Sequence, residues 1–119
     1  MSNENNILKF LMKQSKEMNA SDIHLHVGSP PILRIKGELV RLDNLPMLSS
    51  DEMLELIKDT LVKERDRNAL EENGGIDIAL AMQGIGRFRV NIFRQRGSTS
   101  IVARRISDEI PTFKSLNLP

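Results

Sequence analysis

The segment from Arg87 to Ile106 constrains the fold most, because its pattern predicts an antiparallel β-hairpin. Apolar and polar residues alternate in its first half, which places Phe88, Val90 and Ile92 on one face. Arg96-Gly97 is typical of a tight turn, and a second strand-like stretch follows it. A hairpin that is apolar on one face has to bury that face against another layer, so we expect a sheet covered on one side.

The rest of the chain predicts helices and further strands. Helical periodicity covers Ile7 to Met18, a capping box of Ser49 and Glu52 begins a second helix, and Lys63 to Glu72 is a charged, helix-prone segment. Further strands are expected at residues 22–27, 32–36, 39–42 and 76–81, the second and third of these joined by a tight turn at Gly37-Glu38. This order predicts an α+β fold with helices mainly on one face of an antiparallel sheet.

Length and composition narrow the possible functions. The 119 residues suffice for one domain, and the net charge of +1 points to neither a nucleic acid nor a membrane surface. The chain has four Phe and no Trp or Tyr, which weighs against proteins that stack bases on aromatic rings. It has no Cys, which excludes a disulfide framework and a thiolate metal site. No apolar run approaches the roughly 20 residues of a membrane-spanning helix.

The strongest candidate site is an arginine pair on the predicted hairpin. A turn at Arg96-Gly97 places Arg89 directly opposite Arg104, with Arg87 on the same face as Arg89. Directly opposed side chains have Cβ atoms about 4.5–5.5 Å apart, where like charges are destabilising. Such a pair is tolerated if an anion lies between the two groups, and the guanidinium fork suits phosphate oxygens. A solvated arginine face is the alternative, and a one-residue slip would move Arg104 to the other face.

Other polar clusters point less clearly to chemistry. His24 and His26 lie two residues apart on one strand face, but two such ligands without a third make no metal site, so we predict none. Glu71, Glu72 and Asp77 are interpreted as solvated groups around a helix end. The sequence contains no G-x-x-x-x-G-K-[ST] loop, so we assign no catalytic residue and expect no ATP hydrolysis from this chain alone.

Four blocks of sequence resemble the PilT-like pilus motor ATPases of the type II/IV secretion ATPase superfamily. In chain order they are ASDIHL at residues 20–25, GSPPILRIKG at 28–37, GRFRVNIF with QRG at 86–97, and RRI with IP and LNLP at 104–119. They span the chain from about Ala20 to its end, in the family's order and spacing. Ser107 departs from the pattern, since the family often has Pro there.

This resemblance implies a PAS-like N-terminal domain over residues 1–106 and, at 107–119, the start of a linker to a RecA-like ATPase domain. It implies a homohexamer that holds ATP and Mg in the whole protein, whereas the fragment alone holds no cofactor. Two family arginines that reach the phosphates map onto Arg89 and Arg104, with Arg87 beside them. Because Arg105 follows Arg104 directly, the resemblance does not decide which of the two faces the phosphate.

The implied partners are the domain's own RecA-like domain, neighbouring subunits and the pilus platform protein of the inner membrane, with no nucleic acid. The implied location is cytoplasmic, at the inner face of the cytoplasmic membrane. Retraction in twitching motility is the favoured role, because extension and secretion motors usually carry a further N-terminal domain before the ASD block. A fragment of such an extension or type II secretion motor is an alternative. An arginine-ribbon nucleic-acid-binding module and a PAS-type ligand sensor are alternatives of another class.

Overall fold

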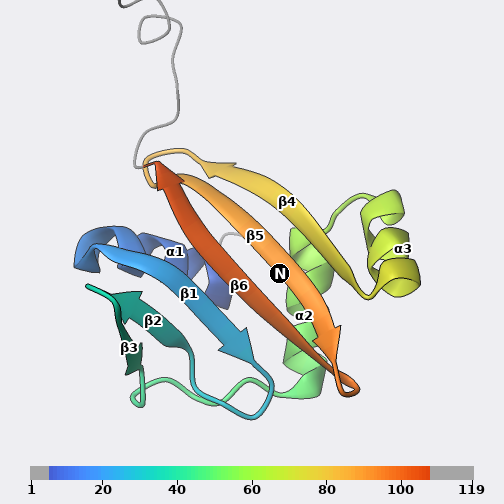
Figure 1. Ribbon diagram of the computed structural model, residues 1–119, viewed down its shortest axis with the longest axis horizontal. Coiled ribbons are helices and arrows are strands. Elements are labelled where there is room, and N and C mark those ends of the chain that lie inside the picture. The colour runs from blue at the N-terminus through green and yellow to red at the C-terminus, as the bar shows by residue number, and fades with distance from the viewer. Residues whose placement is uncertain (1–5, 108–119) are drawn as a thin grey trace, which may run out of the picture.

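The computed structural model describes residues 6–107, which form a six-stranded antiparallel sheet and three helices (Figure 1). In chain order the elements are α1 (Ile7–Met18), β1 (Ala20–His26), β2 (Ile32–Ile35), β3 (Glu38–Arg41), α2 (Ser50–Thr60), α3 (Glu64–Asn73), β4 (Gly75–Met82), β5 (Gly86–Gln95) and β6 (Ser98–Ser107).

The first and last strands lie side by side at the centre of the sheet. The strand order is β3-β2-β1-β6-β5-β4, and β1 pairs antiparallel with both β2 and β6. Helices α1 and α2 lie behind the sheet in Figure 1, and α3 packs beside the edge strand β4. The predicted α+β class is confirmed, and the face of the sheet turned away from α1 and α2 is here called the open face.

The hydrophobic core lies between the sheet and the helices α1 and α2. It is built from alternate residues of the strands and from one side of each helix, because burying each of the larger apolar side chains stabilises the fold by about 1.5–3 kcal/mol. The buried strand residues include Ile23, Leu25, Phe88, Val90, Ile92, Ile101 and Ala103, and the buried helix residues include Leu8, Leu11, Met12, Met53, Leu56 and Ile57.

Local signals account for the helix ends. Asn6 caps α1 by accepting a hydrogen bond from the Lys9 amide at 2.8 Å. The predicted capping box of α2 is confirmed: Ser49 Oγ accepts from the Glu52 amide at 3.1 Å, and the Ser49 amide donates to the Glu52 carboxylate at 2.9 Å. Hydrogen bonding of the Glu52 carboxylate to Ser49, first to its backbone amide and then to its side chain, holds the pKa of Glu52 below its ordinary value.

Two-residue turns fix the register of both hairpins. Arg96-Gly97 has φ angles of 54° and 79°, as a type I′ turn requires, and confirms the predicted turn between β5 and β6. The predicted turn at Gly37-Glu38 is wrong by one residue. The turn is Lys36-Gly37, with φ angles of 52° and 83°, because Glu38 already pairs with Ile35 in the ladder.

The predicted linker begins at Ser107, the last residue of β6, and residues 108–119 lie outside the described part of the chain. Among the helices of residues 6–107, none is both long and apolar enough to span a membrane.

Candidate functional site

A row of four charged side chains crosses the open face of the sheet. The strand pairings run from Arg34 on β2 to Asp22 on β1, then to Arg104 on β6 and Arg89 on β5. Directly paired residues of antiparallel strands project to the same face, so all four side chains lie on the open face. We call these four residues the charged row.

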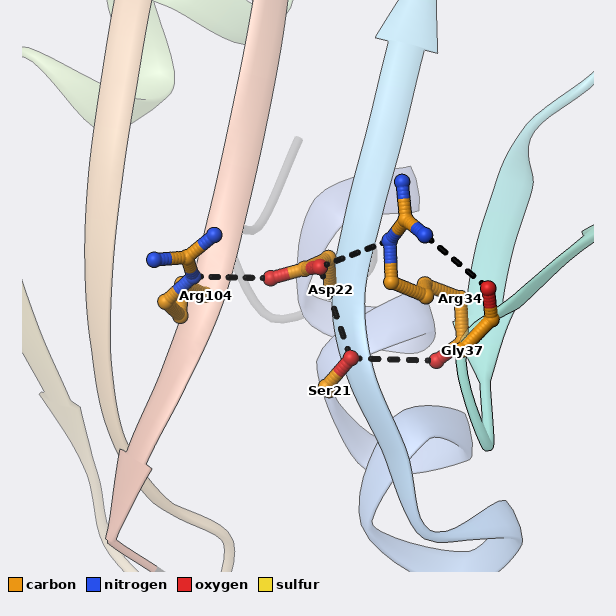
Figure 2. A network of polar contacts seen from close by, with 5 residues as sticks. All are labelled: Ser21, Asp22, Arg34, Gly37 and Arg104. Carbon is orange, nitrogen blue, oxygen red and sulfur yellow. Dashed lines mark hydrogen bonds and ion pairs between the residues drawn. The ribbon is translucent and has the colours of Figure 1, made fainter.

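Asp22 is the buried centre of the charged row, with a side chain only 6% exposed. Its Oδ1 accepts a hydrogen bond from Arg104 Nε at 3.0 Å, and its Oδ2 lies 3.2 Å from Arg34 Nε (Figure 2). Ser21 Oγ donates to Oδ2 at 3.4 Å. A second hydrogen bond holds Arg34 in place, because its Nη1 donates to the Gly37 carbonyl at 3.0 Å. A carboxylate is retained at this depth because charged donors on both sides compensate its desolvation.

Arg104 is anchored at one atom and open at the others. Its Nε carries the bond to Asp22, while its side chain is 73% exposed. Within residues 6–107, neither terminal nitrogen of Arg104 reaches a protein acceptor. The outer edge of this guanidinium, formed by its two terminal nitrogens, is therefore accessible to an acceptor outside the domain.

Arg89 lies directly opposite Arg104, which confirms the predicted register. Its Nη2 is 3.8 Å from Asp77 Oδ2 on β4, and the two side chains are 67% and 52% exposed, which makes a weak surface ion pair. Each arginine thus has a carboxylate on its outer side, Asp22 for Arg104 and Asp77 for Arg89. Their mutual repulsion is offset in part without an ion between them. The regular pairing with β4 keeps Arg87 on the same face, where it is half-buried, and a register irregularity between Arg87 and Phe88 places it opposite Ser107.

Arg105 points to the other face of the sheet and reaches the end of α1. Its Nη1 donates to the carbonyls of Ser15 at 3.1 Å and Ala20 at 2.8 Å, and lies 3.4 Å from the Asn19 side-chain oxygen. The Ser15 carbonyl lies in the last turn of α1, where the helix dipole carries partial negative charge that a guanidinium stabilises. Of the two adjacent arginines, Arg104 is the one on the open face.

The histidines flank the charged row without forming a metal centre. His26 Nδ1 lies 2.8 Å from Ser100 Oγ, and His24 Nε2 is buried without a hydrogen-bond partner among the described residues. Burial lowers the pKa of His24, and the neighbouring Asp22 carboxylate opposes that shift. Within residues 6–107, no three His, Cys, Asp or Glu side chains gather as a metal site. Glu71 forms an ion pair with Arg94 at the end of α3.

Asp22 and Arg34 belong to the site but were not predicted as site residues from the sequence. The sequence placed Asp22 only at the start of a predicted strand, because the pairing of β1 with β6 joins residues 82 positions apart and leaves no local signal. A signal was nevertheless present in the four sequence blocks. Asp22, Arg34, Arg89 and Arg104 come one from each block, and the fold brings all four blocks together in the charged row.

Known proteins resemble this chain in sequence and in fold. It is 34% identical over 109 residues to the type IV pilus ATPase PilU of Pseudomonas aeruginosa, and 34% identical over 108 residues to the type IV pilus retraction ATPase PilT of the same organism. The crystal structure of the pilus retraction motor PilT with bound ADP superposes with a TM-score of 0.75 at 42% identity, over 96% of this chain. No model of a protein family matches the sequence.

These matches cover most of this chain but only part of each relative. The alignments include 92% and 91% of the chain, yet they span 28% of PilU and 31% of PilT. The superposition covers 33% of the PilT crystal structure. The chain therefore corresponds to about a third of such a protein.

Proposed function

Because the chain belongs to the PilT-like family within the type II/IV secretion ATPases, we propose that it is the nucleotide-closing N-terminal domain of a type IV pilus retraction motor. In this role the PAS-like domain packs over ATP and Mg held by a RecA-like domain of the same protein. It acts within a homohexamer that works from the cytoplasm on a platform protein of the inner membrane. The chain itself has no phosphate-binding loop, so its arginines act on a nucleotide that the RecA-like domain holds.

The observation that carries this proposal is the exposed outer edge of Arg104 beside Arg89 on the open face. Two guanidinium groups directed to one side can meet a phosphate bidentately, and such charge-assisted bonds are about twice as strong as neutral ones. Arg87 lies on the same face and adds positive charge near the exit of β6. Arg89 can leave its weak pair with Asp77 at little cost when a phosphate approaches.

Differential contact with ATP and ADP is what turns this geometry into motion. The arginines reach the terminal phosphate only when the domain closes, so ATP favours the closed state by the energy of those contacts. Hydrolysis and loss of that phosphate remove the contacts, and the domain is released. A cycle of closing and opening around the ring supplies the movement that retracts the pilus.

The test is ATP hydrolysis by the whole protein that carries this domain. Arg104→Ala and Arg89→Ala should each lower kcat about a hundredfold, because each removes a charge that stabilises the phosphates. Arg96→Ala is the matched control: it removes an arginine of the same hairpin, in the turn beyond the ladder, and should hydrolyse ATP normally. Normal turnover by Arg104→Ala would contradict the proposal.

A second measurement uses the domain alone. Titration calorimetry with MgATP should detect no binding tighter than about 1 mM, since the phosphate-binding loop belongs to another domain. Steeply salt-dependent binding of DNA or RNA by the isolated domain would instead support the arginine-ribbon alternative.

A further inference from the structure

Asp22 stands apart from every other titratable group in residues 6–107. It is the one charged residue among the buried polar residues of this part of the chain, with 4% of the whole residue's surface exposed. Burying a carboxylate is costly, and here the cost is offset by two arginines from the strands on either side. An apolar residue at this position would avoid that cost, so the carboxylate calls for a reason beyond stability.

The atoms that Asp22 contacts indicate such a reason. A guanidinium has two edges that can hold an oxyanion, one containing Nε and one formed by the two terminal nitrogens. Asp22 takes only the Nε of Arg104, at 3.0 Å, and leaves the terminal edge accessible. A long arginine side chain otherwise loses considerable rotamer freedom on binding a ligand. Anchoring at Nε removes part of that cost beforehand.

Arg89 also lies near a carboxylate, but that carboxylate does not anchor it. Its partner Asp77 lies 3.8 Å away, and that contact is made by the terminal Nη2, so it occupies the edge that a phosphate would use. Both of these side chains are more than half exposed. Asp22 and Asp77 therefore place the same charge near an arginine of the same face but differ in contact geometry and in burial, so comparing them separates anchoring from charge.

We propose that Asp22 is a positioning residue, which holds Arg104 by Nε so that its terminal nitrogens face the nucleotide phosphate. The inference rests on the function proposed above. It predicts the opposite effect on the reaction with ATP from the one that the net charge of the open face would predict. If charge alone governed the site, removing either carboxylate would make the open face more positive and favour ATP. If Asp22 positions Arg104, removing Asp22 impairs the reaction despite the added positive charge.

The experiment compares Asp22→Asn with Asp77→Asn in the whole ATPase, measuring kcat and KM for ATP. Asp22→Asn should lower kcat/KM about ten- to a hundredfold, the size expected for a misplaced catalytic group. Asp77→Asn should leave kcat/KM within about threefold of the wild type, because Asp77 makes only a weak exposed pair with Arg89 and an exposed 3.3 Å hydrogen bond from Asn91 Nδ2. An unchanged or raised kcat/KM in Asp22→Asn would overturn the inference.

A double-mutant cycle separates positioning from general stabilisation. In the Arg104→Ala background, adding Asp22→Asn should cost no further activity, since Asp22 acts through Arg104; a further loss would overturn the inference. If Asp22→Asn fails to fold, Asp22→Glu keeps the charge but shifts the carboxylate, and it should also lower kcat/KM at retained thermal stability. An unchanged kcat/KM in that folded variant would equally overturn the inference. Normal turnover by Arg104→Ala alone would instead refute the proposed function.

Discussion

Arg104 and Arg105 are adjacent in sequence, yet they belong to different regions of the molecule. Arg105 lies on the covered face, where the residue is half-buried and its guanidinium donates to backbone carbonyls of Ser15 in α1 and Ala20 in β1. Arg104 lies on the open face, where its side chain is 73% exposed and meets a carboxylate only through Nε. The side of the sheet decides what the same side chain does. On one side it fixes a helix to a strand, and on the other it is available to a ligand.

The largest contrast between the two faces should come from neighbouring residues of β5. Phe88→Ala empties a site that is 1% exposed and should lower the free energy of unfolding by about 3–5 kcal/mol. Arg89→Ala removes an exposed side chain with a weak ion pair and should cost less than about 1 kcal/mol. Urea denaturation of the domain measures both. Equal losses would show that the open face contributes to the fold as much as the core does.

The two adjacent arginines should differ by a smaller amount. Arg105→Ala removes charged hydrogen bonds to the carbonyls of Ser15 and Ala20 and should cost about 1.5–3 kcal/mol. Arg104→Ala should cost about 1 kcal/mol, because it removes one charged donor from the buried Asp22 carboxylate while Arg34 still holds the other oxygen. Arg105→Met keeps most of the apolar stem and isolates the loss of the hydrogen bonds. A greater loss of unfolding free energy in Arg104→Ala than in Arg105→Ala would contradict the roles assigned to the two faces.

The smallest effect should be a pH dependence that originates near the charged row. Burial lowers the pKa of His24 below its ordinary value of 6.5, with Asp22 opposing the shift and Arg34, Arg104 and His26 adding to it. The unfolded chain therefore binds more protons near that pH. Stability from this group is fully present above pH 6.5 and is lost as the pH falls through the lowered pKa.

His24→Gln should remove that part of the pH dependence, measured as the urea midpoint between about pH 5 and 7. His26→Gln is the matched control on the same strand face and should retain it. A pH profile unchanged by His24→Gln would contradict the assignment.

Local signals in the sequence were sufficient for much of the fold. The predicted helix from Ile7 to Met18 matches α1, and the capping box of Ser49 and Glu52 begins α2 as expected. The register that sets Arg89 opposite Arg104 was predictable because a two-residue turn fixes it. All of these cues lie within a few residues of the structure that they specify.

The remainder of the site depends on contacts that no local pattern encodes. The burial of Asp22 requires β1 to lie between β2 and β6, and no local sequence pattern predicts that strand order. The direction of Arg105 was within reach, since the alternation from Ile101 through Ala103 places it on the covered face. Its hydrogen bonds to the end of α1 still could not be foreseen, because they join residues 85 and 90 positions apart.

The central position of β1 has a consequence for biosynthesis. A ribosome delivers β1, β2 and β3 early, yet β1 meets its second neighbour only when β6, the last described strand, has emerged. Until then one edge of β1 presents unpaired backbone groups to the cell, the condition in which nascent sheets aggregate or engage chaperones. Asp22 lacks Arg104 throughout that interval, so the buried acid acquires its full set of partners only once β6 has emerged.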